Sequence, residues 1–156
     1  MSSKLIPRFT PFYCTGPRRE FLWAWLAATL LSGLPSTTWA LLTGGDPLEA
    51  TRAAGAMLLP RELETPPLLL AAALVHPLVS LFWALVLWLA LPRRHLVLWA
   101  IAASAAIALL DLRVIAPAFF PAVAALDFWP QLADHLAWGA SYSVGLSLGR
   151  PSATRP

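Results

Sequence analysis

Four long apolar stretches, separated by short polar segments, dominate the pattern of this chain. They run from about Phe21 to Thr43, Pro67 to Leu91, Leu96 to Pro117 and Pro130 to Gly149. Each is close to the ~20 residues that an α-helix needs to cross a bilayer. None alternates apolar and polar positions as the strands of a membrane barrel do. The pattern therefore predicts an all-α fold, an integral membrane four-helix bundle.

Two of the polar segments have turn or helix signals of their own. Pro92-Arg93-Arg94-His95 joins the second and third stretches and is short enough to predict an antiparallel hairpin. Between the first and second stretches, Asp46 precedes Pro47, which is typical of a helix start. We expect a short surface helix there that serves as a structured connector, with a gate or lid as the alternative.

The composition supports a membrane protein and excludes an ordinary soluble domain. Of the 156 residues, 58% are hydrophobic and 12% are charged, whereas a soluble domain carries about a quarter charged residues. The mean hydropathy is +0.67 and the pI is about 9.8. The basic residues flank the apolar stretches, so they indicate topology and lipid headgroup contact, and nucleic acid is not expected as a partner. The single cysteine, Cys14, has no partner for an intramolecular disulfide.

The distribution of basic residues predicts the orientation of the four spans. Eight of the eleven lysines and arginines fall on one side: Lys4, Arg8, Arg18, Arg19, Arg93, Arg94, Arg150 and Arg155. The positive-inside rule places that side in the cytoplasm. We therefore expect cytoplasmic tails at 1–20 and 150–156 around a membrane domain at 21–149, in the inner membrane of a bacterium. Cleavage of the first stretch as a signal peptide, after Thr38 and Ala40, is the competing interpretation.

Polar side chains gather within the second, third and fourth stretches. The candidate site consists of His76, Ser80, Asp111, Asp134 and His135. An ionisable group inside a membrane costs free energy unless it is paired or hydrated, so each such residue is a candidate for a functional site. Ser80 lies four residues after His76 and shares its helix face. The cluster is expected in the outer half of the membrane.

Four interpretations of this cluster remain open from the sequence. The side chains can hold helices together by hydrogen bonds, or pass protons or bind a cation in a transport component. His76 and His135 can also be axial ligands of a b-type haem. Ser80, His76 and Asp111 are the residue types of a hydrolase triad, but no nucleophile-positioning turn accompanies them. We expect a protein without catalytic residues and without a cofactor.

Small residues at intervals of four predict close helix packing. Ser141, Gly145 and Gly149 form one ridge on the fourth stretch, and Ala100, Ser104 and Ala108 form another on the third. Such ridges allow helices to approach closely in lipid. His-Glu-x-x-His runs, cysteine pairs and glycine-rich phosphate loops are absent from the sequence, so no metal site is expected.

Two segments of the second and fourth stretches resemble a group of small bacterial inner-membrane proteins, the YagU-like proteins. The segments are His76-Pro77-Leu78-Val79-Ser80-Leu81-Phe82-Trp83-Ala84 and Asp134-His135-Leu136-Ala137-Trp138-Gly139-Ala140. The resemblance covers two of the four stretches and departs from the group at Pro77. It implies a four-helix inner-membrane protein without an established catalytic activity, and it draws attention to His76 and His135.

The functional expectation is a non-enzymatic structural or accessory membrane component. Its partners would be the lipid bilayer and either a second copy or another membrane protein, contacted through the fourth helix. A small transport or proton- or cation-coupled component is the alternative. The two differ in one structural respect: a transport site requires His76 and Asp134 to face a cavity, whereas a packing role requires them to be buried and bonded to each other.

Overall fold

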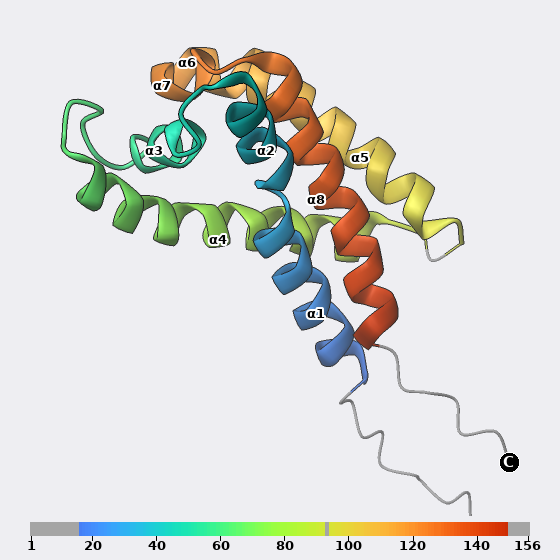
Figure 1. Cartoon of the computed structure of the whole chain (residues 1–156). Coiled ribbons are helices and arrows are strands. Elements are labelled where there is room, and N and C mark those ends of the chain that lie inside the picture. The colour runs from blue at the N-terminus through green and yellow to red at the C-terminus, as the bar shows by residue number, and fades with distance from the viewer. Residues whose placement is uncertain (1–15, 93, 150–156) are drawn as a thin grey trace, which may run out of the picture.

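The chain folds entirely into helices within the residues that the structure, a computed structural model, describes. These are residues 16–92 and 94–149. The helices are α1 (Gly16–Leu31), α2 (Leu34–Thr43), α3 (Glu49–Gly55), α4 (Thr65–Ala90), α5 (Leu96–Leu110), the π-helical segment η1 (Asp111–Ile115), α6 (Ala116–Phe119), α7 (Pro121–Ala124) and α8 (Phe128–Gly149) (Figure 1). The all-α prediction is confirmed. Cys14, Arg93, the first fifteen residues of the expected N-terminal tail and the tail at 150–156 lie outside the described residues.

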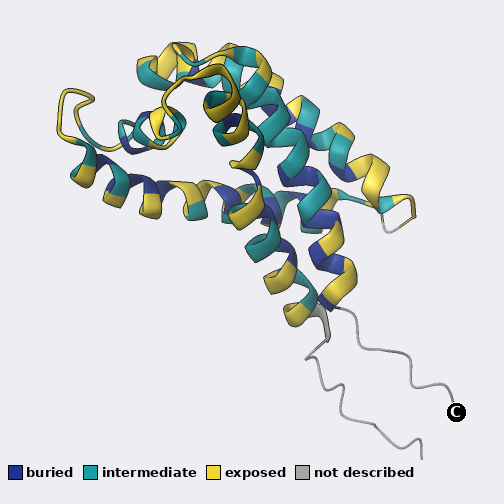
Figure 2. Ribbon diagram, viewed as in Figure 1, coloured by how far each residue is buried: buried dark blue, intermediate teal, exposed yellow. Residues whose placement is uncertain are grey.

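Within the described residues, two helical stretches are long and apolar enough, by length and composition, to cross a membrane. They are Thr65–Ala90, which is α4, and Leu96–Phe119, which comprises α5, η1 and α6. An exposed apolar stripe runs along α4 with helical spacing, and the exposed positions are visible in Figure 2. Its members are Leu70, Leu74, Leu78, Phe82, Leu85 and Leu89. An exposed apolar stripe of this extent is typical of a surface that contacts a membrane or another protein.

The first apolar stretch is interrupted, which the sequence pattern does not predict. Helix α1 starts at Gly16, four residues before the expected end of the tail, and stops at Leu31; α2 begins at Leu34 after Gly33. Pro35 lies in the first turn of α2, so it cannot donate a hydrogen bond to the Leu31 carbonyl. Glycine is also a weak helix former. Together Gly33 and Pro35 explain why the helix stops and restarts here.

The third apolar stretch contains a second irregularity. Residues Asp111–Ile115 form a π-helical turn before α6 continues the same axis. Pro117 has no backbone N–H, so the Arg113 carbonyl cannot receive its ordinary α-helical bond. The wider turn follows from that missing bond, and turns of this type are frequent at functional sites.

Helix α8 is the centre of the bundle, in contact with α1, α2 and α5. The core contains Trp138, Tyr142 and Leu146 of α8, together with alanines of α1, α4 and α5. The turn after α4 reverses the chain as expected. However, α4 and α5 diverge from it (Figure 1), because α5 presents its small residues to α8 while α4 packs against α1 and α3. The expected hairpin therefore opens into a space between its two helices.

The connector helix α3 lies against the start of α4 rather than free on the surface. A Cβ atom at Gly55 would lie 2.0 Å from the Leu68 carbonyl oxygen, so only glycine permits this approach. Ala53 is also buried. Before α3, the Asp46 side chain accepts a hydrogen bond from the Leu48 N–H and forms an ion pair with Arg52. The connector is thus anchored at both ends.

Candidate functional site: a polar cleft between diverging helices

A cleft of about 840 Å³ occupies the space between α4 and the α5–η1–α6 stretch. Residues of α1, α2 and α8 line it on one side, and residues of α3 and α7 line another. Most lining residues are apolar, including Phe82, Trp83 and Phe120. The polar lining residues are Thr29, Ser32, Ser36, Thr37, Thr51, His76, Ser80, Ser104, Asp111, Gln131, Asp134 and His135. The volume falls within the range of small-molecule sites, about 300–1,000 Å³.

Three interruptions of regular helix border this cleft. One is the break between α1 and α2 at Gly33, another is the π turn that begins at Asp111, and the third is Pro77 within α4. Pro77 cannot donate to the Ala73 carbonyl, and both residues line the cleft. Within a membrane, irregular backbone is tolerated where it is buried in protein or lines a hydrated cavity. The backbone therefore supplies hydrogen-bonding groups to the same space as the side chains.

Asp134 of α8 caps the interrupted helix across the bundle. Its Oδ1 accepts a hydrogen bond of 2.8 Å from the Ser36 N–H. This N–H belongs to the first turn of α2, where backbone donors have no intrahelical partner. A carboxylate also interacts favourably with the positive end of a helix dipole. No lysine or arginine of the described residues forms an ion pair with Asp134.

The bonding of His76 determines which ring nitrogen remains available. Nε2 lies 3.0 Å from the Thr29 carbonyl oxygen and 3.3 Å from Ser32 Oγ. A carbonyl oxygen only accepts, so Nε2 carries a proton and donates it. In the neutral ring Nδ1 is then an acceptor, and no partner for it is found in residues 16–92 and 94–149. His76 is exposed to the cleft.

His135 and Asp111 form a pair whose geometry allows one shared proton. His135 Nδ1 donates to the Gln131 carbonyl at 2.8 Å, and Nε2 lies 3.5 Å from Asp111 Oδ2. The proton between Nε2 and Oδ2 can belong to the ring, as an ion pair, or to the carboxyl, as a neutral pair. The side chains are about a quarter exposed, 26% for His135 and 23% for Asp111. Water in the cleft can therefore exchange with this proton.

Ser80 belongs to a separate, buried chain of hydrogen bonds. Trp138 Nε1 donates to Ser80 Oγ at 2.9 Å, and Ser80 lies 2.7 Å from Thr29 Oγ1. Thr29 donates in turn to the Trp25 carbonyl, so Ser80 must donate to Thr29. The ring of Trp138 stacks on Tyr142, whose hydroxyl donates to the Ala84 carbonyl. This chain ties α8 to α4 and α1, and it has the geometry of a packing device.

Ser104 is the opposite case, a buried hydroxyl without a partner. Its side chain is 1% exposed and lines the cleft from α5. No hydrogen-bond partner for Oγ is found in the described part of the chain. An unsatisfied buried hydroxyl costs about 1–3 kcal/mol relative to a satisfied one. The oxygen itself has almost no accessible surface, because it lies against Gly139 of α8.

The two small-residue ridges lie at different interfaces. A Cβ atom at Gly145 would lie 2.4 Å from the Trp23 carbonyl oxygen, and one at Gly149 would lie 2.3 Å from Glu20 Cα. Both glycines thus pack against α1. On α5, Ala100, Ser104 and Ala108 are buried, and Gly139 of α8 faces Ser104 and Ala100. Ser141 is only partly buried.

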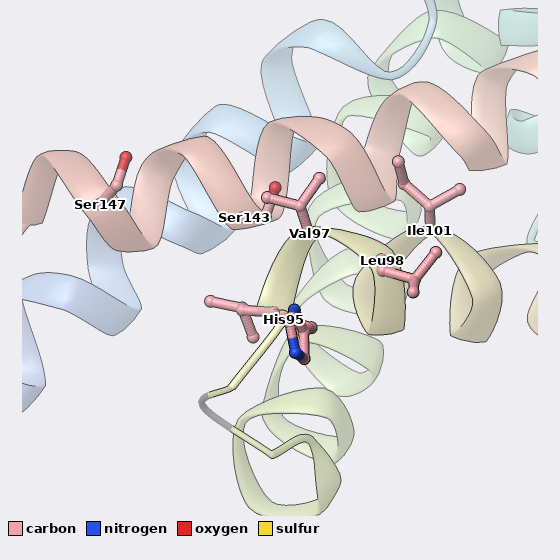
Figure 3. Close-up of a pocket in the computed structure, with 7 residues that line it drawn as sticks. His95, Val97, Leu98, Ile101, Ser143 and Ser147 are labelled. Atoms are coloured by element: carbon pink, nitrogen blue, oxygen red, sulfur yellow. The ribbon is translucent and has the colours of Figure 1, made fainter.

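A second hollow, of about 490 Å³, lies between the start of α5 and the end of α8. Figure 3 shows His95, Val97 and Leu98 on one side of it and Ser143 and Ser147 on the other. Both serine hydroxyls donate to carbonyls of their own helix. The hollow therefore presents no unbonded serine donor, in contrast to the cleft beside α4.

The arrangement of the histidines does not favour haem or metal ligation. Both ring nitrogens of His135 face bonding partners, and Nε2 of His76 donates to a carbonyl. Within residues 16–92 and 94–149 no group of three histidine, cysteine or carboxylate side chains could hold a metal ion. Haem binding by these two histidines would require at least one of the His135 bonds to break.

The structure separates the five residues of the predicted cluster into two groups. His76, Asp111, Asp134 and His135 line the cleft, whereas Ser80, although it also borders the cleft, is buried in the tryptophan–threonine chain. Sequence reasoning missed Thr29 and Gln131 as bonding partners. Thr29 lies at helical spacing from Ser32 and Ser36, which is the signal that could have included it.

Comparison with known proteins gives no further assignment. No protein-family model matches the chain, and no similar protein was found among curated sequences or solved structures.

Proposed function

We propose that this chain is a small, non-enzymatic transport or proton-coupled component of a bacterial inner membrane. The observation that carries the proposal is that His76, Asp111, Asp134 and His135 all line one cleft. Residues that only hold helices together would be buried and bonded to one another, as Ser80 is. These four also make bonds, but unlike Ser80 they remain at least partly exposed in the cleft, so a proton or a ligand can reach them.

In this proposal the membrane domain has four spans. Helices α4 and α5–η1–α6 are two of them, and the pair α1–α2 and helix α8 are the others. The break at Gly33 makes α1 and α2 individually short, and the polar groups of α8 lower its hydropathy. Those groups are directed at the cleft or at neighbouring helices, which reduces their cost in lipid. The basic residues support cytoplasmic termini.

Proton binding is the chemical step that the site supports best. The His135–Asp111 pair shares one proton, and His76 Nδ1 can accept another. Carboxylate and imidazole groups in series carry protons in membrane transporters. A discontinuous helix beside the site is also typical of transporters, because its free backbone groups contact the transported species.

A structural or accessory role is the second candidate, favoured by the buried chain from Trp138 to Trp25. The fourth helix is less suited to a partner than the sequence suggested, because Gly145 and Gly149 already pack against α1. In a purely structural protein, the charge on Asp134 and Asp111 would have no measurable effect beyond stability.

The two candidates differ in their response to a proton concentration step. Proteoliposomes adsorbed on a solid-supported membrane should give a transient charge displacement when the external pH is lowered. Asp134→Asn and Asp111→Asn should each reduce it, while Asp127→Asn, at an exposed carboxylate outside the cleft, should not. A transient no larger than that of protein-free liposomes would overturn the transport proposal and leave the structural one.

A further inference from the structure

The cleft contains a carboxylate, that of Asp134, which forms no ion pair with another described residue. Asp134 takes its hydrogen bond from Ser36, an uncharged residue. Arginines in the described part of the chain contact other groups: Arg52 pairs with Asp46, Arg61 with Glu62, Arg94 with the ring of His95, and Arg113 lies over the ring of Phe128. A carboxylate in apolar surroundings is strongly stabilised by a cation that enters beside it.

The Asp111 carboxylate does not compete for the same cation. It faces His135 at 3.5 Å, and the pair is neutral overall when it holds one proton. The carboxylate of Asp134 forms no such pair, so the cleft offers one carboxylate to an entering cation. The cleft is therefore complementary to one monovalent cation.

The wall is also rich in hydrogen-bond acceptors. His76 Nδ1 is an acceptor in the neutral ring. The Ala73 carbonyl lacks its helical donor because Pro77 has no N–H. A ligand that donates several hydrogen bonds fits this wall better than one that accepts them.

The rest of the cleft selects against a bare metal ion. No set of three metal-ligating side chains is found in the described residues, and hard cations require about six oxygen ligands. The remaining lining is apolar and includes the aromatic side chains Phe82, Trp83 and Phe120. Aromatic faces attract organic cations and bury apolar groups.

We infer that the cleft binds a protonated lipophilic amine, with its ammonium group beside Asp134 and its apolar body against α4 and α6. This inference rests on the proposed transport function and names its ligand class. Charge complementarity with Asp134 and the acceptor Nδ1 of His76 in the same cleft are the two observations that carry it. Since α4 and α5 diverge, such a molecule can enter from the bilayer between them.

Three probes of matched shape test the inference. They are 1-naphthylmethylammonium, its neutral analogue 1-naphthalenemethanol and the anion 1-naphthoate. Equilibrium dialysis against the full chain in lipid nanodiscs, with empty nanodiscs subtracted, separates saturable binding from partition into lipid. We expect saturable binding of the ammonium probe, binding at least about tenfold weaker for the alcohol, and none for the anion.

Two variants and a control locate the site. Asp134→Asn keeps an acceptor for the Ser36 N–H but removes the charge, and it should weaken ammonium binding at least about tenfold. Ala73→Trp fills an exposed position of the cleft wall, leaves Asp134 in place, and should also abolish binding. Asp127→Asn should bind as the unchanged protein does. Size-exclusion profiles establish that each variant is folded before it is compared.

Several outcomes would overturn the inference. They are equal binding of the ammonium and alcohol probes, unchanged ammonium binding in both Asp134→Asn and Ala73→Trp, or no saturable binding by the unchanged protein. The proton-step currents decide the proposed function separately. A proton-dependent current without ammonium binding leaves that function standing with another ligand. Ammonium binding without the current leaves a binding protein that is not proton-coupled.

Discussion

Asp134 of α8 and Ser36 of α2 lie 98 positions apart in the chain and are joined by a 2.8 Å hydrogen bond from the Ser36 N–H to Oδ1. The bond satisfies a helix start that no residue of the first stretch caps by a side chain. It also places a carboxylate at the wall of the cleft. One contact therefore links the stability of the interrupted helix to the chemistry of the candidate site.

Removing the acceptor oxygen of this cap should destabilise the protein, whereas removing only its charge should not. Asp134→Ala should lower the free energy of unfolding by roughly 1–2 kcal/mol, as for other helix caps. Asp134→Asn should retain most of the stability, because its carboxamide oxygen still accepts the Ser36 N–H. Thermal unfolding in detergent, followed by the fluorescence of the eight tryptophans, measures both. Equal losses in the two variants would show that charge, not capping, stabilises α2.

The contact between α1 and α8 depends on the absence of a side chain at Gly145. In Gly145→Ala the new methyl would overlap the Trp23 carbonyl oxygen and Ala24 Cα, at 2.4 and 2.5 Å. We expect a loss of roughly 1–3 kcal/mol of unfolding free energy, as for other overpacked sites. Gly33→Ala is the matched control, since no atom lies within 4 Å of its Cβ position. The same thermal assay compares them, and a Gly145→Ala protein as stable as Gly33→Ala would contradict the close packing.

The two buried serines Ser80 and Ser143 should respond differently to loss of the hydroxyl. Both are 4% exposed. Ser80→Ala leaves the Trp138 indole N–H without an acceptor and should cost about 1–3 kcal/mol. Ser143 bonds only the Ala140 carbonyl of its own helix, so Ser143→Ala should cost less than about 1 kcal/mol. Denaturant or thermal unfolding ranks the pair, and the reverse order would remove Ser80 from its bridging role.

Acid should loosen the connector helix through Asp46. The hydrogen bonds from Arg52 and from the Leu48 N–H hold the pKa of this carboxyl below its ordinary value. A depressed pKa means that the stabilisation is present above the ordinary carboxyl pKa and is lost as the pH falls through the folded-state value. Hydrogen exchange of α3, corrected for its intrinsic pH dependence, should therefore accelerate below about pH 4. Asp46→Asn should lack this acid-dependent step, whereas Glu62→Gln should keep it.

Much of the helical content could be predicted from the apolar stretches, because their length and lack of alternation admit few other structures. The ends of α4 lie close to those expected. The break at Gly33 was harder to predict, because the partner that caps the restarted helix, Asp134, comes from the fourth stretch. The π turn at Asp111 likewise has only Pro117 as a local signal.

The sequence predicted which residues gather at the candidate site, but not how the helices place them around a cleft. Grouping His76, Asp111, Asp134 and His135 followed from the cost of ionisable groups in apolar stretches. The short turn between α4 and α5 does not predict that these helices diverge. Their divergence depends on the packing of small residues of α5 against Gly139 of α8. For the same reason the sequence could not separate Ser80 from the residues that only line the cleft.

Water access to the polar cleft is central to the proposed function, and cysteine labelling tests it most directly. In a Cys14→Ser background, Ala73→Cys lines the cleft, whereas Leu74→Cys lies at nearly the same depth on the exposed apolar stripe and does not line it. A charged, membrane-impermeant methanethiosulfonate reagent reacts only with thiols that contact water. Added to right-side-out vesicles, it should modify Ala73→Cys and leave Leu74→Cys unmodified. If both cysteines are equally unreactive, the cleft is closed or filled by lipid, and the account of a hydrated polar site is contradicted.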